Sequence, residues 1–235
     1  MSIATKLAVI KQSALEKAPP HIIDTLASAI SKLEGSGLTK SALQVGQQIP
    51  EFNLPDATGN MVSSTTLLAK GPLLVSFYRG GWCPYCNVEL RALQSHLKEF
   101  QRTGVTLVAI SPQTPDHSLS TQEKAGLQYP VLSDVGNQLA RKFGIVYQLD
   151  ENLRSIYQKL GVDLETHNGG KAIELPVPAT YLVDSKGTVR NAFIDVDYTK
   201  RLEPTMALSW IDALGEQEPK PSPKMRSGSC CRKKR

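Results

Sequence analysis

The 235-residue sequence predicts an α/β fold with a central mixed sheet and flanking helices. A continuous apolar run at residues 72–77 is followed by a helix with one apolar face, and then by a second apolar run at residues 105–110. This strand–helix–strand order implies a right-handed parallel crossover. Residues 179–183 and 188–194, joined by a turn, predict an antiparallel β-hairpin. A sheet with both parallel and antiparallel neighbours follows.

The first 44 residues predict an N-terminal helical extension. Ile23, Leu26, Ile30 and Leu33 recur at helical spacing, and a Pro-Pro pair at positions 19–20 separates them from an earlier helical piece. The N-terminal extension could form a contact in an oligomer or a lid over the rest of the protein, and these interpretations are as good as a chemical role.

Residues 45–214 predict the main domain. Glycines and prolines punctuate short extended pieces before the first buried strand. Leu90, Leu93, Leu97 and Phe100 predict one helix that ends at Gly104. A short helix is expected at residues 137–143, and Pro204 opens a last helix that runs to Leu214.

Residues 215–235 predict a disordered basic tail. Seven basic and two acidic residues there account for the whole net charge of +5, so the folded body is neutral. We therefore expect no nucleic-acid-binding face on the body. Cys230 and Cys231 lie in this tail, and three interpretations stay open. The cysteines resolve a sulfenic acid on a partner subunit, or they are acylated at a membrane, or they have no role in a solvated tail that could serve as a nuclear-import address.

The cysteines number four and form two pairs, which is unlike a secreted disulfide framework. A structural zinc site needs four closely placed ligands. His21, His96, His117 and His167 are scattered singly, so each is expected to be a surface or packing residue. No metal and no cofactor are expected.

The Cys83-Pro84-Tyr85-Cys86 motif follows a buried strand and opens a helix. Proline is favoured at the first helical position, which makes Cys83 the N-cap and Cys86 the third helical residue. The helix N-terminus favours a thiolate, and thiolate is the reactive form. Residues three apart on one turn are also close enough for a disulfide. The alternative is that both cysteines are small buried apolar residues. Trp82 either shields the thiols or simply packs.

The sequence resembles the alkyl hydroperoxide reductase/thiol-specific antioxidant family, in its peroxiredoxin-like branch with a CxxC. The segments that carry the resemblance lie within residues 45–214: 46–52, 77–78, 81–86, 131–134, 142–145, and 178–184 with Gly187. The resemblance implies a thioredoxin-like fold and a thiol-dependent peroxidase that needs a peroxide and an external dithiol reductant such as thioredoxin. A homodimer and a cytoplasmic location are also expected, with nuclear import through the tail, a mitochondrial location or membrane tethering as alternatives.

The site departs from the family pattern. Counted from Tyr78, Cys86 falls on the family's peroxidatic position, Arg79 replaces a proline and Cys83 replaces a threonine. Where the family carries a peroxide-binding arginine, this chain has Pro178, which resembles the cis-proline of thioredoxins. Arg79 is either the substitute for that positive charge or a solvated charge at the strand end.

Three functions stay open. In a peroxidase, Cys86 attacks the peroxide and Cys83 condenses with the sulfenic acid. In a thioredoxin-like oxidoreductase of protein disulfides, Cys83 attacks and Cys86 resolves. The third is a non-catalytic redox-sensing or interaction module.

Overall fold

A five-stranded mixed sheet forms the centre of the computed structural model, which describes residues 1–170 and 173–217. Its strand order is β5-β4-β3-β8-β9, with β3 parallel to β4, β4 parallel to β5, and β8 antiparallel to both β3 and β9. The strands are β3 (Leu73–Phe77), β4 (Thr106–Ser111), β5 (Val131–Ser133), β8 (Ala179–Val183) and β9 (Val189–Ile194). The predicted crossover and hairpin are confirmed, and with them the mixed sheet.

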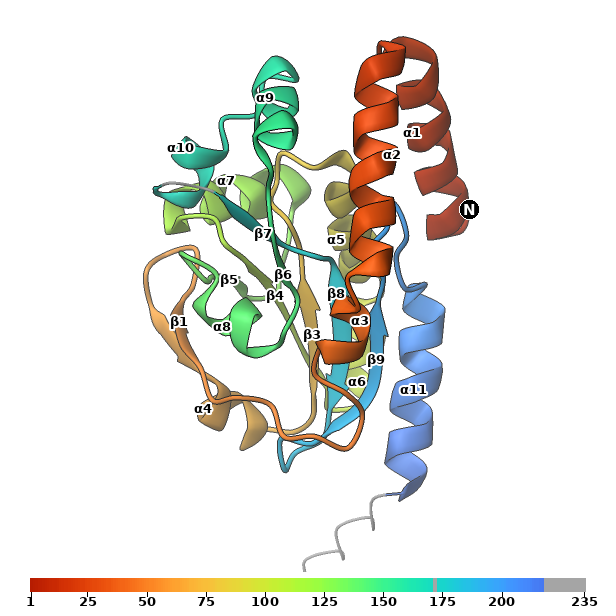
Figure 1. Ribbon diagram of the computed structural model, residues 1–235. Helices are drawn as coiled ribbons and strands as arrows, with labels where there is room; N and C mark the ends of the chain where they lie inside the picture. The colour runs from red at the N-terminus through yellow and green to blue at the C-terminus, as the bar shows by residue number, and fades with distance from the viewer. Residues whose placement is uncertain (171–172, 218–235) are drawn as a thin grey trace, which may run out of the picture.

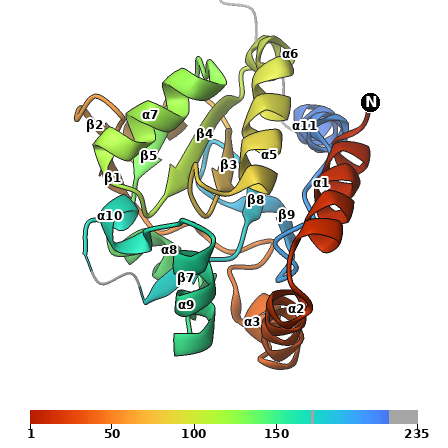
Figure 2. The same cartoon turned by 90° about the horizontal axis from the view of Figure 1, so that it is seen from above.

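Helices cover both faces of the sheet (Figures 1 and 2). One face packs on the core that contains residues of α1 (Ile3–Lys17), α5 (Pro84–Ser95), α6 (Leu97–Arg102) and α11 (Pro204–Gln217). The other face packs on α3 (Leu38–Ser41), α4 (Ser64–Leu68) and α8 (Gln138–Lys142). Helix α7 (Pro115–Ala125) lies against α5 and β5. Alternate residues of β3 point to opposite cores, as the pleat of a strand requires.

A smaller apolar core lies beside the sheet. It joins α9 (Glu151–Lys159) and α10 (Leu164–Asn168) to α2 (Pro20–Gly35) and to the two-stranded ribbon of β6 (Val146–Gln148) and β7 (Glu174–Pro176). A second ribbon pairs β1 (Asn53–Pro55) with β2 (Met61–Ser63). The small core matters for function because it places α9 over the end of β3.

The N-terminal extension packs on the body through α1. The carboxylate of Glu203 accepts hydrogen bonds from the backbone N–H groups of Ile3 and Ala4, at 3.1 and 2.8 Å. Ile3 and Leu7 are buried against the core that contains α5. Because α1 lies along the cysteine helix of its own chain, the interpretation of the extension as a cover of its own body is supported.

The helix expected from Leu90 through Phe100 is wrong as one element. It is two helices, because the backbone at His96 leaves the helical region (φ −105°, ψ 5°). Ser95 Oγ donates to the Ala92 carbonyl at 2.7 Å, and His96 Nδ1 lies 3.0 Å from the same oxygen. These side chains compete with the helical hydrogen bonds and end α5.

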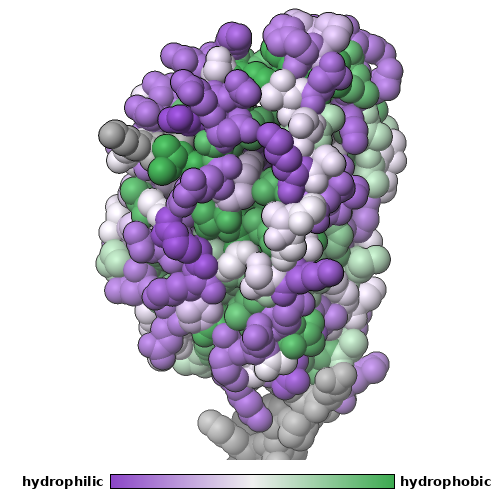
Figure 3. Space-filling model, in the orientation of Figure 1, coloured by the Kyte–Doolittle hydropathy of each residue, from purple (hydrophilic) through white to green (hydrophobic). Residues whose placement is uncertain are grey.

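The last helix continues to Gln217, three residues beyond the expected end, and the tail with Cys230 and Cys231 lies outside the described residues. Within the described part of the chain, no helix is both long and apolar enough to cross a membrane. On the face shown in Figure 3, hydrophobic side chains form small patches broken by hydrophilic ones.

Candidate active site

Cys83 and Cys86 lie at the start of α5, directly after the carboxyl end of β3. Cys83 is the N-cap, with extended dihedral angles (φ −87°, ψ 116°), and Pro84 is the first helical residue, as predicted. The turn into the motif needs a glycine at Gly80, whose φ is +149° and where a Cβ would lie 2.3 Å from Trp82 Nε1. This turn lets the indole fold back over the end of β3.

Both thiols are free and almost fully buried, with exposed fractions of 1% for Cys83 and 0% for Cys86. A hydrogen bond links their side chains. Each sulfur also receives a guanidinium group: Arg79 Nη1 lies 3.8 Å from Cys83 Sγ, and Arg201 Nη2 lies 3.2 Å from Cys86 Sγ. The site is therefore a dithiol between two arginines.

The electrostatics divide the roles of the two thiols. Burial alone would raise the pKa of Cys83, but the hydrogen bond from Cys86 and the charges of Arg79 and Arg201 outweigh it and lower that pKa to about 5. Burial, the hydrogen bond with Cys83 and the negative charge on Cys83 raise the pKa of Cys86 well above its ordinary value. At neutral pH the pair therefore carries one negative charge, on the N-cap sulfur.

Arg79 is buried in an aromatic cage, with 1% of its surface exposed. Its guanidinium carbon lies 4.2, 4.9 and 5.4 Å from the ring centres of Tyr198, Trp82 and Tyr157. Its Nη2 donates to the Tyr157 hydroxyl. The interpretation of Arg79 as a solvated charge is wrong, because cation–π contacts and Cys83 replace its water.

Trp82 is half-buried and covers Arg79 rather than lying loose on the surface. Its ring meets that of Tyr157 edge-on, with centroids 5.4 Å apart. The indole covers Arg79, and Arg79 in turn lies beside Cys83. Trp82 therefore both packs against its neighbours and shields the thiol pair.

Arg201 and Glu89 are functional candidates that the sequence analysis missed. Arg201 Nε donates to Glu89 Oε2 at 2.5 Å, and its Nη1 donates to the carbonyls of Tyr198 and Lys200. Burial raises the pKa of Glu89 to about 7, although the positive charge of Arg201 opposes this. No spacing in the sequence signals the pair, because 112 residues separate the two side chains.

Pro178 is buried between β7 and β8, but the expected cis bond is wrong: the described residues contain no cis peptide bond. Val177 N–H donates to the Ile145 carbonyl at 2.8 Å, and pairing with β3 begins at Ala179. The chain therefore runs from β7 to β8 without a tight turn that would favour a cis bond. The positive charges at the thiols come from Arg79 and Arg201.

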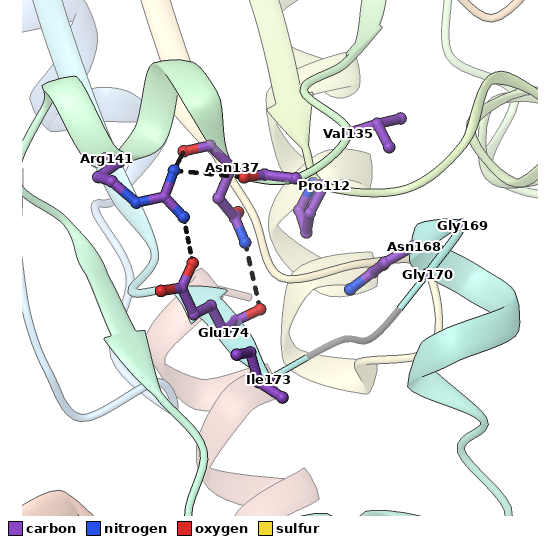
Figure 4. A pocket seen from close by; sticks show the side chains of 10 residues that line it. Pro112, Val135, Asn137, Arg141, Asn168, Gly169, Gly170, Ile173 and Glu174 are labelled. Atoms are coloured by element: carbon purple, nitrogen blue, oxygen red, sulfur yellow. Dashed lines mark hydrogen bonds and ion pairs between the residues drawn. The ribbon is translucent and has the colours of Figure 1, made fainter.

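A cavity of about 340 Å³ lies away from the thiols, between α8 and α10 (Figure 4). Arg141 forms an ion pair with Glu174 across it, and Asn137 Nδ2 donates to the Glu174 carbonyl at 3.2 Å. Neither cysteine and neither arginine of the dithiol site lines this cavity. It carries none of the predicted chemistry.

A model of the AhpC/TSA family matches residues 45–192, more than half of the chain. The chain belongs to the AhpC/TSA family. Among curated members, peroxiredoxin Bcp of Escherichia coli strain K12 is 27% identical over 169 residues, which cover 72% of this chain and 96% of that protein. The family model leaves outside its match the whole N-terminal extension, the last part of the main domain from residue 193, and the tail.

Solved structures that are similar to this chain include peroxiredoxins. Peroxidoxin BcpB from Mycobacterium tuberculosis is 23% identical, with a TM-score of 0.58 over 73% of this chain and 98% of that one. Bacterioferritin comigratory protein from Xanthomonas campestris is 18% identical, with a TM-score of 0.53 over 70% of this chain and 92% of that one. These likenesses establish the fold of the AhpC/TSA domain as the thioredoxin-like fold of peroxiredoxins.

Proposed function

We propose that this AhpC/TSA protein is a thiol-dependent peroxidase that reduces hydrogen peroxide or alkyl hydroperoxides through a Cys83–Cys86 dithiol–disulfide cycle. One observation carries the proposal: two free thiols lie together at a helix N-terminus, and each faces its own arginine. The names of the relatives agree with it, since they are peroxiredoxins and the Xanthomonas study concerns alkyl peroxide reduction.

The first step is attack of the Cys83 thiolate on the outer oxygen of the hydroperoxide. A sulfur–oxygen bond forms, the O–O bond breaks, and the alkoxide takes a proton and leaves as an alcohol (or as water from hydrogen peroxide). Cys83 is then a neutral sulfenic acid. Arg79, fixed beside Cys83 Sγ by its aromatic cage, is placed to stabilise the negative charge that moves onto the peroxide oxygens.

The second step is condensation. Burial still raises the pKa of Cys86, but once Cys83 has lost its negative charge that further cause is gone, while Arg201 remains 3.2 Å from Cys86 Sγ. Cys86 loses its proton and attacks the Cys83 sulfur, which forms the disulfide and releases water. Glu89, with a pKa of about 7 and a direct bond to Arg201, is placed to relay a proton at neutral pH. Over both steps, the Cys83 thiolate, the Cys86 thiol, one hydroperoxide and one added proton give the disulfide, the alcohol and water.

This order of attack is the reverse of the order implied by position in the family. Cys86 occupies the family's peroxidatic position, whereas the lowered pKa and the N-cap place belong to Cys83. We give the electrostatics priority, because the thiolate is the nucleophile.

An external dithiol of the thioredoxin type closes the cycle by reducing the disulfide. Because both sulfurs are buried, the start of α5 has to open for a protein reductant to reach them. The oxidoreductase alternative keeps the CxxC in its favour but loses the thioredoxin-like cis-proline.

The test is a paired assay on one preparation. Hydrogen peroxide consumption in the presence of thioredoxin, thioredoxin reductase and NADPH is compared with reduction of insulin disulfides. We expect peroxide turnover that is absent in Cys83→Ser/Cys86→Ser, and little insulin reduction. Insulin reduction without peroxide turnover would establish the oxidoreductase instead, and neither activity would favour the non-catalytic module.

A further inference from the structure

A cleft lined by basic side chains lies beside the loop that carries the cysteines. It has a volume of about 370 Å³, and its walls come from α5, α7, α10 and the active-site loop at Gly81 and Trp82. Its titratable lining residues are Arg91, His117, Lys124 and His167, which we call the basic cleft. No aspartate or glutamate lines it.

The two permanent charges of the basic cleft lack an acidic partner. Arg91 on α5 and Lys124 on α7 are exposed, and among the residues that the structure describes neither forms an ion pair. Six other basic side chains do form such pairs. An unneutralised pair of cations facing one cavity attracts an anion.

The two histidines are not isolated, contrary to the expectation from the sequence. His117 Nδ1 and His167 Nδ1 lie 3.1 Å apart, with ring centroids 4.3 Å apart. Burial and the nearby His117 and Lys124 lower the pKa of His167, and Asp163 opposes them only in part. The two imidazole rings therefore place hydrogen-bonding nitrogens in the cleft wall beside the two cations.

The basic cleft is joined to the catalytic loop through Gln113. Its Oε1 accepts from the Gly81 N–H at 2.8 Å, and its Nε2 lies 3.4 Å from His167 Nδ1. The backbone of Gly81 also lies close to the cleft wall, because a Cβ at this position would lie 2.2 Å from Thr121 Oγ1. A ligand in the cleft consequently lies against the backbone two residues before Cys83.

We infer that the basic cleft binds the carboxylate of a small organic molecule that reacts at the Cys83–Cys86 pair. The volume suits a small ligand, and arginine with hydroxyl and amide side chains matches the geometry of a carboxylate. This inference rests on the proposed peroxidase function. The carboxylate belongs either to a hydroperoxide substrate or to a small thiol that reduces the disulfide, because both have to approach the same loop.

Steady-state kinetics on the full chain separate these two sources. Linoleic acid hydroperoxide is compared with its methyl ester as substrate, and glutathione with its diethyl ester as reductant. In one of these two comparisons, we expect the KM of the free acid to be about fivefold lower than that of its ester. Two partly screened ion pairs, with Arg91 and Lys124, account for a difference of that size. The pair that shows the preference identifies the source.

The variant Arg91→Gln/Lys124→Gln should abolish the preference by raising the KM of the charged member to that of its ester. Lys40→Gln/Arg102→Gln removes the same charge from exposed positions outside the cleft and should preserve it. No preference in the wild-type enzyme, or a preference that survives in Arg91→Gln/Lys124→Gln, would overturn the inference.

Calorimetric titration with S-methylglutathione and with octanoate, neither of which reacts, measures the cleft independently of turnover. Binding of either carboxylate that is lost in Arg91→Gln/Lys124→Gln supports the inference even if the wild-type protein reduces no peroxide. Absence of binding by both probes counts against the cleft even if peroxide turnover is normal. The proposed function and the cleft can therefore fail separately.

Discussion

Replacing Arg79 by glutamine should raise the pKa of Cys83. The guanidinium Nη1 lies 3.8 Å from Cys83 Sγ. Two unit charges at that distance interact by about 4 kcal/mol at an effective dielectric constant near 20, which corresponds to a pKa change of about three. Arg201 stays in place, so we expect the pKa to rise from about 5 to between about 6 and 8.

The measurement is the rate of iodoacetamide alkylation of the Cys83 peptide against pH, followed by mass spectrometry so that the other thiols do not interfere. A Cys86→Ser background leaves one thiol in the site and keeps a hydroxyl donor beside Cys83. At pH 6 the rate should fall at least twofold in Arg79→Gln and return to the parental rate above pH 9.

Two further variants control this experiment. Arg79→Lys keeps the charge and should largely restore the midpoint, and Arg154→Gln removes an exposed arginine of α9 and should leave it unchanged. A midpoint that stays near 5 in Arg79→Gln would refute the assignment of Arg79 as the group that ionises Cys83.

Four other outcomes are expected. Folding raises the pKa of Glu89 from 4.5 to about 7, so the folded state holds the Glu89 proton more tightly than the unfolded state. The free energy of unfolding should therefore fall as the pH rises between those two values. Glu89→Gln should remove that fall, as measured by urea unfolding curves. The lowered pKa of Cys83 has the opposite effect: it adds stability that is fully present above the ordinary pKa of 9 and is lost as the pH falls toward about 5. Cys83→Ser should remove this pH-dependent stability. Arg201→Gln should cost about 3–5 kcal/mol of unfolding free energy by leaving Glu89 buried and unpaired, with partial recovery in Glu89→Gln/Arg201→Gln. Deletion of residues 218–235 should change neither the unfolding midpoint nor peroxide turnover, and a loss of turnover would place a tail cysteine in the cycle.

The sequence predicts those parts of the fold that depend on local pattern. Continuous apolar runs identify β3 and β4, and Pro84 identifies the N-terminus of the cysteine helix. Both depend on neighbouring residues, which is why spacing is enough to find them. The break at His96 escapes such patterns, because side-chain hydrogen bonds end the helix inside a regular apolar repeat.

The electrostatic environment of the site could not be predicted from the sequence. Arg201 and Glu89 meet across 112 residues, and Arg79 is buried because Tyr157 and Tyr198 arrive from two distant segments. A charged residue at a strand end is usually solvated, and only the three-dimensional cage reverses that expectation.

The basic cleft and the trans peptide bond before Pro178 also depend on tertiary packing, which the sequence pattern does not show. His117 and His167 come together because the start of α7 meets the end of α10, where the Thr114 N–H donates to the His167 carbonyl at 3.0 Å. The proline matches a thioredoxin position in sequence, but the extended path from β7 to β8 sets its isomer.

In the proposed cycle, Cys83 attacks the peroxide and Cys86 resolves the product. The most direct test exposes Cys86→Ser and Cys83→Ser separately to one equivalent of hydrogen peroxide, traps sulfenic acid with dimedone, and locates the adduct by peptide mass spectrometry. We predict a dimedone adduct on Cys83 in Cys86→Ser and none on Cys86 in Cys83→Ser. An adduct on Cys86 in Cys83→Ser, with none on Cys83 in Cys86→Ser, would contradict the account and restore the order that the family position of Cys86 implies.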